Sequence, residues 1–127
     1  MATEGSSGKT VLIVDDSAAI RHELREEFIL NGFTVCAEAE NGHQAIDLAR
    51  SHRPRLIILD LSMPVMNGLD SAPELRKILP DTPIVLYTVF ADAVSILDVR
   101  AKGVTAILAK SEPLATVIAV ADRLLQL

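Results

Sequence analysis

The chain of 127 residues contains a single cysteine, Cys36, and no apolar run that approaches the roughly 18 residues needed to cross a membrane. An intramolecular disulfide is therefore impossible, and a reducing, cytoplasmic compartment is expected. The first ten residues, MATEGSSGKT, lack the apolar core of a secretion signal. We interpret residues 1–8 as a polar tail and residues 9–127 as one domain, since no linker or second core is indicated.

Basic residues are few and scattered, with 12 Lys and Arg against 17 Asp and Glu and a formal net charge of −5. Nucleic-acid binding by this chain is therefore not expected, because it normally requires a basic patch. The three histidines, His22, His43 and His52, lie in segments with helical spacing. No paired His or Cys spacing is present, which argues against a zinc site.

Five short apolar runs recur along the chain and rarely alternate with polar residues, as is typical of strands buried on both faces of a parallel sheet. They cover residues 11–14, 35–37, 56–59, 84–87 and 105–108. The segments between them have helical spacing. The predicted helices lie around residues 20–28, at 42–52, before Pro80 with a capping box at Ser71 and Glu74, at 92–102, and from residue 112 onward. This alternation predicts an α/β domain with right-handed crossovers.

Polar residues follow four of the predicted strands, at the edge where ligands bind to open α/β sheets. Asp15 and Asp16 follow the first strand and Asp60 the third. Thr88 ends the fourth strand and Lys110 follows the fifth. The sequence therefore predicts three carboxylates, a hydroxyl and an ammonium group in one place.

Such a cluster of acids needs compensation, because two carboxylates about 4 Å apart repel each other by ~4 kcal/mol at an effective dielectric constant near 20. Either their pKa values rise or a cation binds. Oxygen ligands of this kind suit Mg²⁺. A carboxylate beside Mg²⁺ can attack a phosphoryl group, and Asp60 is the best nucleophile because it ends the central strand. Lys110 and Thr88 would then stabilise the phosphoryl oxygens.

Four stretches resemble the receiver domain of bacterial two-component response regulators. They are VLIVDDS at 11–17, LIILDLSMPVMNGLD at 56–70, LYTVF at 86–90 and ILAK at 107–110. The resemblance covers about residues 9–126. It implies a flavodoxin-like (βα)5 three-layer sandwich with a parallel five-stranded sheet in the order 2-1-3-4-5.

The resemblance also implies roles for individual residues. Asp60 would be the phosphoacceptor, Asp16 a direct Mg²⁺ ligand, and Asp15 a ligand acting mostly through water. The backbone carbonyl of Ser62 would be a further ligand, while Thr88 and Lys110 would hold the phosphoryl group. The donor would be a sensor histidine kinase or a phosphotransfer protein, and the face formed by helix 4, strand 5 and helix 5 would rearrange on phosphorylation.

The sequence departs from this family at three positions that bear on signalling. Ile107 stands where the family usually has an aromatic residue, so the usual aromatic switch cannot operate. Val89 is bulky where the residue after the Thr is typically small. Ser111 and Glu112 separate Lys110 from Pro113, so a cis peptide bond directly after Lys110 is not expected.

Rival functions fit the residues less well. The chain is not expected to be an enzyme, since an aspartyl-phosphate hydrolase resembling the haloacid dehalogenases would carry a second Asp at the position of Ser62. A flavodoxin-like FMN site would need a phosphate-binding loop in place of the acidic DDSAA at 15–19. A pseudo-receiver that binds partners without phosphorylation remains an alternative, favoured by Val89 and Ile107.

The last predicted helix is apolar almost all round, with three polar residues between Leu114 and Leu125. Two explanations stay open for this pattern. Part of the helix forms a homodimer or partner face, together with helix 4 and strand 5, or the helix is buried in the core.

Overall fold

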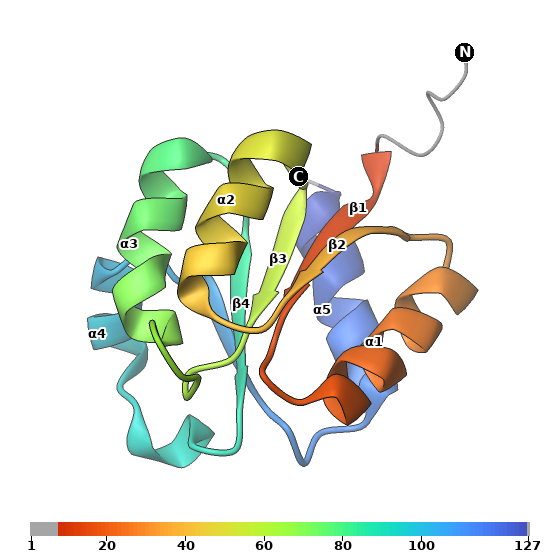
Figure 1. Cartoon of the computed structure of the whole chain (residues 1–127). Coiled ribbons are helices and arrows are strands. Elements are labelled where there is room, and N and C mark those ends of the chain that lie inside the picture. The colour runs from red at the N-terminus through yellow and green to blue at the C-terminus, as the bar shows by residue number, and fades with distance from the viewer. Residues whose placement is uncertain (1–7, 127) are drawn as a thin grey trace.

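The computed structural model describes residues 8–126, which form one parallel sheet of five strands flanked by helices (Figure 1). The strands run in the order β2-β1-β3-β4-β5, as the family resemblance implied. Their bounds are Thr10–Val14 for β1, Thr34–Ala39 for β2, Leu56–Leu59 for β3, Ile84–Thr88 for β4 and Ala106–Ala109 for β5. The polar tail predicted for residues 1–8 lies almost entirely outside the described residues.

The helices cover both faces of the sheet and give a three-layer sandwich (Figure 1). Their bounds are Ala18–Leu30 for α1, Gly42–His52 for α2, Gly68–Ile78 for α3, Ile96–Ala101 for α4 and Leu114–Leu125 for α5, with a 3-10 turn, η2, at Ala91–Ala93. In the part of the chain that the structure describes, no helix is both long enough and apolar enough to cross a membrane.

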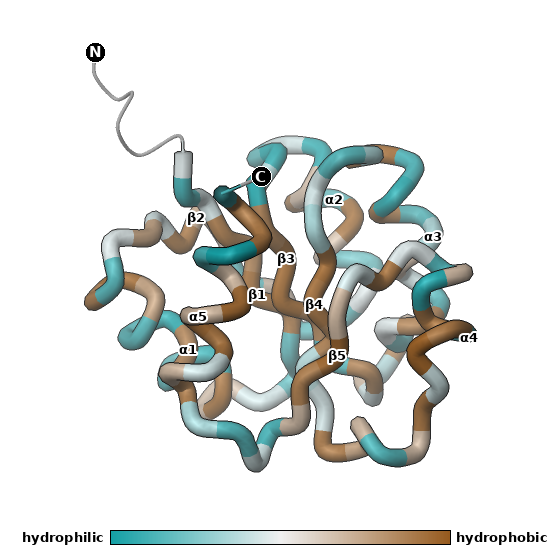
Figure 2. The backbone as a smooth tube through the Cα atoms, turned by 180° about the vertical axis from the view of Figure 1, so that it is seen from behind, coloured by the Kyte–Doolittle hydropathy of each residue, from teal (hydrophilic) through white to brown (hydrophobic). Residues whose placement is uncertain are grey.

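The core consists of two apolar layers separated by the sheet, because successive strand residues point to opposite faces. In β1, Leu12 and Val14 pack with α2, α3 and α4, whereas Val11 and Ile13 pack with α1 and α5. Figure 2 shows the apolar strands at the centre of the molecule. This rigid centre fixes the positions of the residues that follow each strand.

The start of α3 differs from the predicted capping box. Asn67 is the N-cap, and its side chain accepts a hydrogen bond from the Asp70 N–H at 2.8 Å. Ser71 lies inside the helix, where its hydroxyl donates to the Gly68 carbonyl at 3.2 Å. Pro73 therefore lies in the second turn of the helix. The prediction was wrong because Asn67 reaches the orphan N–H groups one turn earlier.

Two other helices are shorter than predicted. The segment 92–102 holds the end of η2 and a six-residue α4, and between them Val94 has extended backbone (φ −114°, ψ 143°). This is the behaviour of a segment rich in β-branched residues, which are poor helix formers. The last helix begins at Leu114 and not at residue 112, because Pro113 disfavours helical backbone at Glu112.

Helix α5 packs extensively against the core, which favours the buried explanation for its apolar sequence. Val117, Ile118 and Ala121 are buried, and the partly buried Leu114, Val120, Leu124 and Leu125 pack against the same layer. The homodimer face stays a prediction. More exposed apolar surface lies on α4, where Leu97 is 75% exposed.

Candidate functional site

The three predicted acids gather at the carboxyl edge of the sheet. Asp15, Asp16 and Asp60 each offer one carboxylate oxygen, and these oxygens lie within 4.8 Å of one another. Strands β1 and β3 are neighbours, and Val14 pairs with Leu59, so the residues that follow them emerge side by side. The Asp60 N–H donates to the Val14 carbonyl at 2.9 Å, which extends this pairing by one residue.

Asp15 is buried and held at every polar group. Its N–H donates to the Ala39 carbonyl at 3.0 Å, and its Oδ1 accepts from the Ser17 N–H at 2.9 Å. Its Oδ2 forms an ion pair with Lys110 Nζ at 2.6 Å. Its own carbonyl accepts from Arg21 at 2.8 Å. Asp16, by contrast, is exposed.

Lys110 follows β5, which is separated from β3 by β4, and its side chain reaches the acids that follow β1 and β3. Its N–H donates to the Thr88 carbonyl at 3.0 Å, which continues the pairing of β5 with β4. Its Nζ lies 2.6 Å from Asp15 Oδ2 and 3.4 Å from Asp60 Oδ1, and the side chain is 14% exposed. Burial alone lowers the pKa of Lys110, but the contacts with Asp15 and Asp60 outweigh it and raise the pKa above its ordinary value.

Asp60 carries the perturbed carboxyl group of the site. Burial, followed by repulsion from Asp15, raises its pKa to about 6, although Lys110 opposes this shift. The residue is 5% exposed. Within residues 8–126, no hydrogen bond reaches Asp60 Oδ2, so one oxygen of this carboxylate is not engaged by the protein.

This raised pKa predicts that the Asp60 carboxylate destabilises the metal-free protein near neutral pH. Between the unfolded value near 4 and the folded value of about 6, the folded state binds more protons, so stability falls as pH rises. Asp60→Asn should match wild type below about pH 4 and exceed its stability above about pH 6 by up to about 3 kcal/mol. Urea unfolding of both proteins in chelator across this range measures the difference. A difference that stays constant with pH would contradict the prediction.

Ser62 follows Asp60 by two residues and Thr88 ends β4, but the contacts observed do not test their predicted roles. Thr88 is fully buried, and its Oγ1 accepts from the Phe90 N–H at 3.0 Å, which leaves the hydroxyl proton free to donate. Ser62 lies in the exposed turn after Asp60. Val89 is 70% exposed, and Ile107 packs partly buried against the core.

The turn from β3 into α3 is held against Asp60 by a close backbone contact. Gly68 donates to the Leu61 carbonyl at 2.9 Å, and a Cβ at Gly68 would lie 2.2 Å from the Asp60 carbonyl oxygen. In the same turn, Val65 adopts a φ of 68°, which is strained for a β-branched residue. In the sequence, Asn67-Gly68 has only the composition of an ordinary turn, because a steric contact across eight residues leaves no local signal.

The donor set fits a hard divalent cation. When ionised, three carboxylates with one ammonium group leave a net charge of −2, which one divalent ion neutralises. Carboxylate oxygens are ligands that Mg²⁺ prefers, and the exposed Asp16 leaves room for the waters that Mg²⁺ retains. The raised pKa of Asp60 is what such a site shows while its charge is uncompensated.

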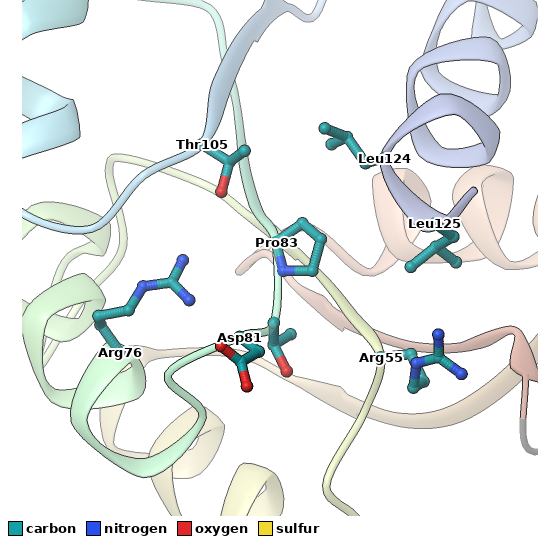
Figure 3. A pocket seen from close by; sticks show the side chains of 8 residues that line it. Arg55, Arg76, Asp81, Pro83, Thr105, Leu124 and Leu125 are labelled. Atoms are coloured by element: carbon teal, nitrogen blue, oxygen red, sulfur yellow. The ribbon is translucent and has the colours of Figure 1, made fainter. Parts of the chain in front are cut away.

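A separate cavity of about 480 Å³ lies at the opposite edge of the sheet (Figure 3). Arg55, Pro83 and Thr105, which precede β3, β4 and β5, line it. Arg76 also lines it and donates to the carbonyls of Leu79, Pro80 and Gly103. None of the predicted site residues lines this cavity, so it is distinct from the acidic site.

Comparison with known proteins gives one consistent family. The model of the response regulator receiver domain matches residues 11–122. The chemotaxis protein CheY of Bacillus subtilis is 34% identical over 93 residues, which cover 73% of this chain and 78% of that protein. The receiver domain of AraT from Geobacillus stearothermophilus is 32% identical with a TM-score of 0.80, and 93% of each chain is covered. The response regulator domain of Thermotoga maritima CheB shares the fold, with a TM-score of 0.85 at 20% identity over 94% of this chain and 97% of that one.

Proposed function

The chain belongs to the receiver domains of two-component response regulators, and from this premise we propose that it accepts a phosphoryl group on Asp60 in a Mg²⁺-dependent reaction. The observation that carries the proposal is the contact of Lys110 with both Asp15 and Asp60 inside a cluster of three carboxylates. A sensor histidine kinase or a phosphotransfer protein is the proposed donor.

Asp60 is the proposed nucleophile because its Oδ2 is not engaged by the protein, whereas both oxygens of Asp15 are. As the Asp60 oxygen bonds to phosphorus, the bond from phosphorus to the donor atom breaks, and the leaving group departs with its electron pair. Asp15, Asp16, Asp60 and the Ser62 carbonyl are the proposed ligands of Mg²⁺, which would neutralise charge on the phosphoryl oxygens.

Lys110 and Thr88 are proposed to hold the phosphoryl group after transfer. Lys110 Nζ already lies between the acids and has three donor hydrogens, so it can contact a phosphoryl oxygen while it keeps Asp15. The Thr88 hydroxyl has a proton free to donate, and a movement of Thr88 towards the phosphoryl group that breaks its bond with the Phe90 N–H would rearrange the loop after β4.

That loop leads through η2 into the short α4, so movement of Thr88 would reach the proposed output face of α4, β5 and α5. Leu97 at 75% and Ile96 at 40% exposure supply apolar contacts on this face. Because Ile107 replaces the usual aromatic residue, the proposed relay runs through the loop backbone and not through a ring. Homodimerisation through this face is a further prediction of the same scheme.

Incubation with acetyl phosphate tests the proposed reaction. Wild type in Mg²⁺ should gain the mass of one phosphoryl group, while Asp60→Asn should gain none and wild type in chelator very little. Asp70→Asn serves as the matched control, because Asp70 is an exposed carboxylate in the first turn of α3. Absence of uptake by wild type would favour the alternative pseudo-receiver, which Val89 and Ile107 suggest.

A further inference from the structure

The turn from β1 into α1 is held by an arginine that the sequence analysis did not single out. Arg21, in the first half of α1, donates from Nη1 to the carbonyl of Asp15 at 2.8 Å. Its Nε donates to Glu38 Oε1 at 3.1 Å. The Arg21 side chain is 16% exposed and that of Glu38 29%, so both bonds are partly shielded from water.

The carbonyl that Arg21 holds belongs to the peptide unit joining Asp15 to Asp16. Because this unit is planar, fixing its carbonyl also fixes the direction of the Asp16 N–H and the start of that residue. Asp15 has other anchors in Ala39, Ser17 and Lys110. Within residues 8–126, no side-chain hydrogen bond holds Asp16 itself, so it is restrained through its two neighbouring peptide units, by Arg21 at the Asp15 carbonyl and by Asp15 Oδ1 at the Ser17 N–H.

Glu38 orients the guanidinium group for this task. It lies on the edge strand β2 and pairs with Ile13 of β1, so it approaches Arg21 from a rigid part of the sheet. Its second oxygen contacts Arg25 Nη1 at 3.3 Å. Arg25 therefore shares the ion pair with Glu38 but does not contact Asp15, and its side chain is 45% exposed.

We propose that Arg21 is a positioning residue for the cation site, which it preorganises by fixing the peptide between Asp15 and Asp16, with Glu38 orienting its guanidinium group. This inference rests on the proposed function, since it takes the three acids to be the Mg²⁺ ligands. Restraints of this kind commonly change metal affinity by 10- to 100-fold although they do not touch the metal.

The two arginines that share Glu38 provide a matched test. Arg21→Gln should raise the dissociation constant for Mg²⁺ about tenfold, whereas Arg25→Gln should change it less than twofold. The dissociation constant of Arg21→Lys for Mg²⁺ should lie between those of the two glutamine variants, because one ammonium group cannot bridge Glu38 and the Asp15 carbonyl with the same geometry. Calorimetric titration of the full chain with Mg²⁺ measures these constants, and thermal unfolding in chelator reports stability separately.

A second readout does not depend on the metal. In chelator, the amide NMR signals of Asp16 and Ser17 should shift in Arg21→Gln and stay in place in Arg25→Gln. If Arg21→Gln does not fold, Arg21→Lys and Glu38→Gln carry the comparison, each with a weakened Mg²⁺ affinity expected.

The outcomes separate this inference from the proposed function. Wild type that binds Mg²⁺ while Arg21→Gln binds it as tightly as Arg25→Gln would overturn the role of Arg21 and leave the function standing. Wild type that neither binds Mg²⁺ nor accepts a phosphoryl group would overturn both.

Discussion

Lys110→Met should cost about 2 kcal/mol of stability at pH 7 in the absence of divalent metal, because it leaves Asp15 and Asp60 buried without their shared cation. The loss stays near this value because Asp60, whose pKa is already raised, can take up a proton. At about pH 4 the loss should shrink, since Asp60 is then protonated in wild type as well.

Mg²⁺ should stabilise Lys110→Met more than it stabilises wild type, because the ion replaces the lost positive charge without competing with the ammonium group. Lys77→Met is the matched control. Lys77 forms an exposed ion pair with Glu74 at 3.4 Å, and its loss should cost no more than about 0.5 kcal/mol. Urea unfolding at both pH values, with and without Mg²⁺, measures all of these differences. Equal stability of wild type and Lys110→Met at pH 7 in chelator would show that Lys110 does not compensate the acids.

Gly68→Ala should have the largest effect on stability, a loss of at least about 3 kcal/mol. The added Cβ would lie 2.2 Å from the Asp60 carbonyl oxygen and 3.1 Å from both the Asp60 carbonyl carbon and the Leu61 Cα. All three are backbone atoms, so no side chain can move aside to relieve the contact. The backbone of Asp60 must shift, and its carboxylate with it.

Gly8→Ala provides the control for this substitution, because a Cβ there would meet no atom within 4 Å and should change stability by less than about 0.5 kcal/mol. Denaturant midpoints of the two variants against wild type give the comparison. A loss below about 1 kcal/mol for Gly68→Ala would mean that the turn relaxes easily and that Gly68 does not fix the position of Asp60.

The sheet and the grouping of the acids could be predicted because both follow from regular properties of the chain. Apolar runs such as 56–59 mark buried strands, and parallel strands place Asp15 and Asp60 at the same edge of the sheet whatever the details of the loops. The strand order 2-1-3-4-5 required the family resemblance, since the alternation of strands and helices alone does not fix which strands are neighbours.

Contacts between distant residues could not be predicted in this way. Arg21 and Glu38 are 17 residues apart and had the appearance of ordinary surface charges, yet they meet across α1 and β2 beside Asp15. The start of α3 was not predicted either, because Asn67 and Ser71 both suit an N-cap, and the N-cap in the structure is Asn67. Each depends on tertiary placement that a single sequence does not encode locally.

The central claim is that Asp60 itself becomes an acyl phosphate, and identifying the modified residue tests it most directly. Borohydride reduces an aspartyl phosphate to homoserine, so wild type treated with acetyl phosphate and Mg²⁺ and then with borohydride can be digested and sequenced by tandem mass spectrometry. Homoserine at position 60, dependent on Mg²⁺, is the predicted result. An unreduced Asp60 together with modification at Asp15, Asp16 or a hydroxyl residue would contradict the account.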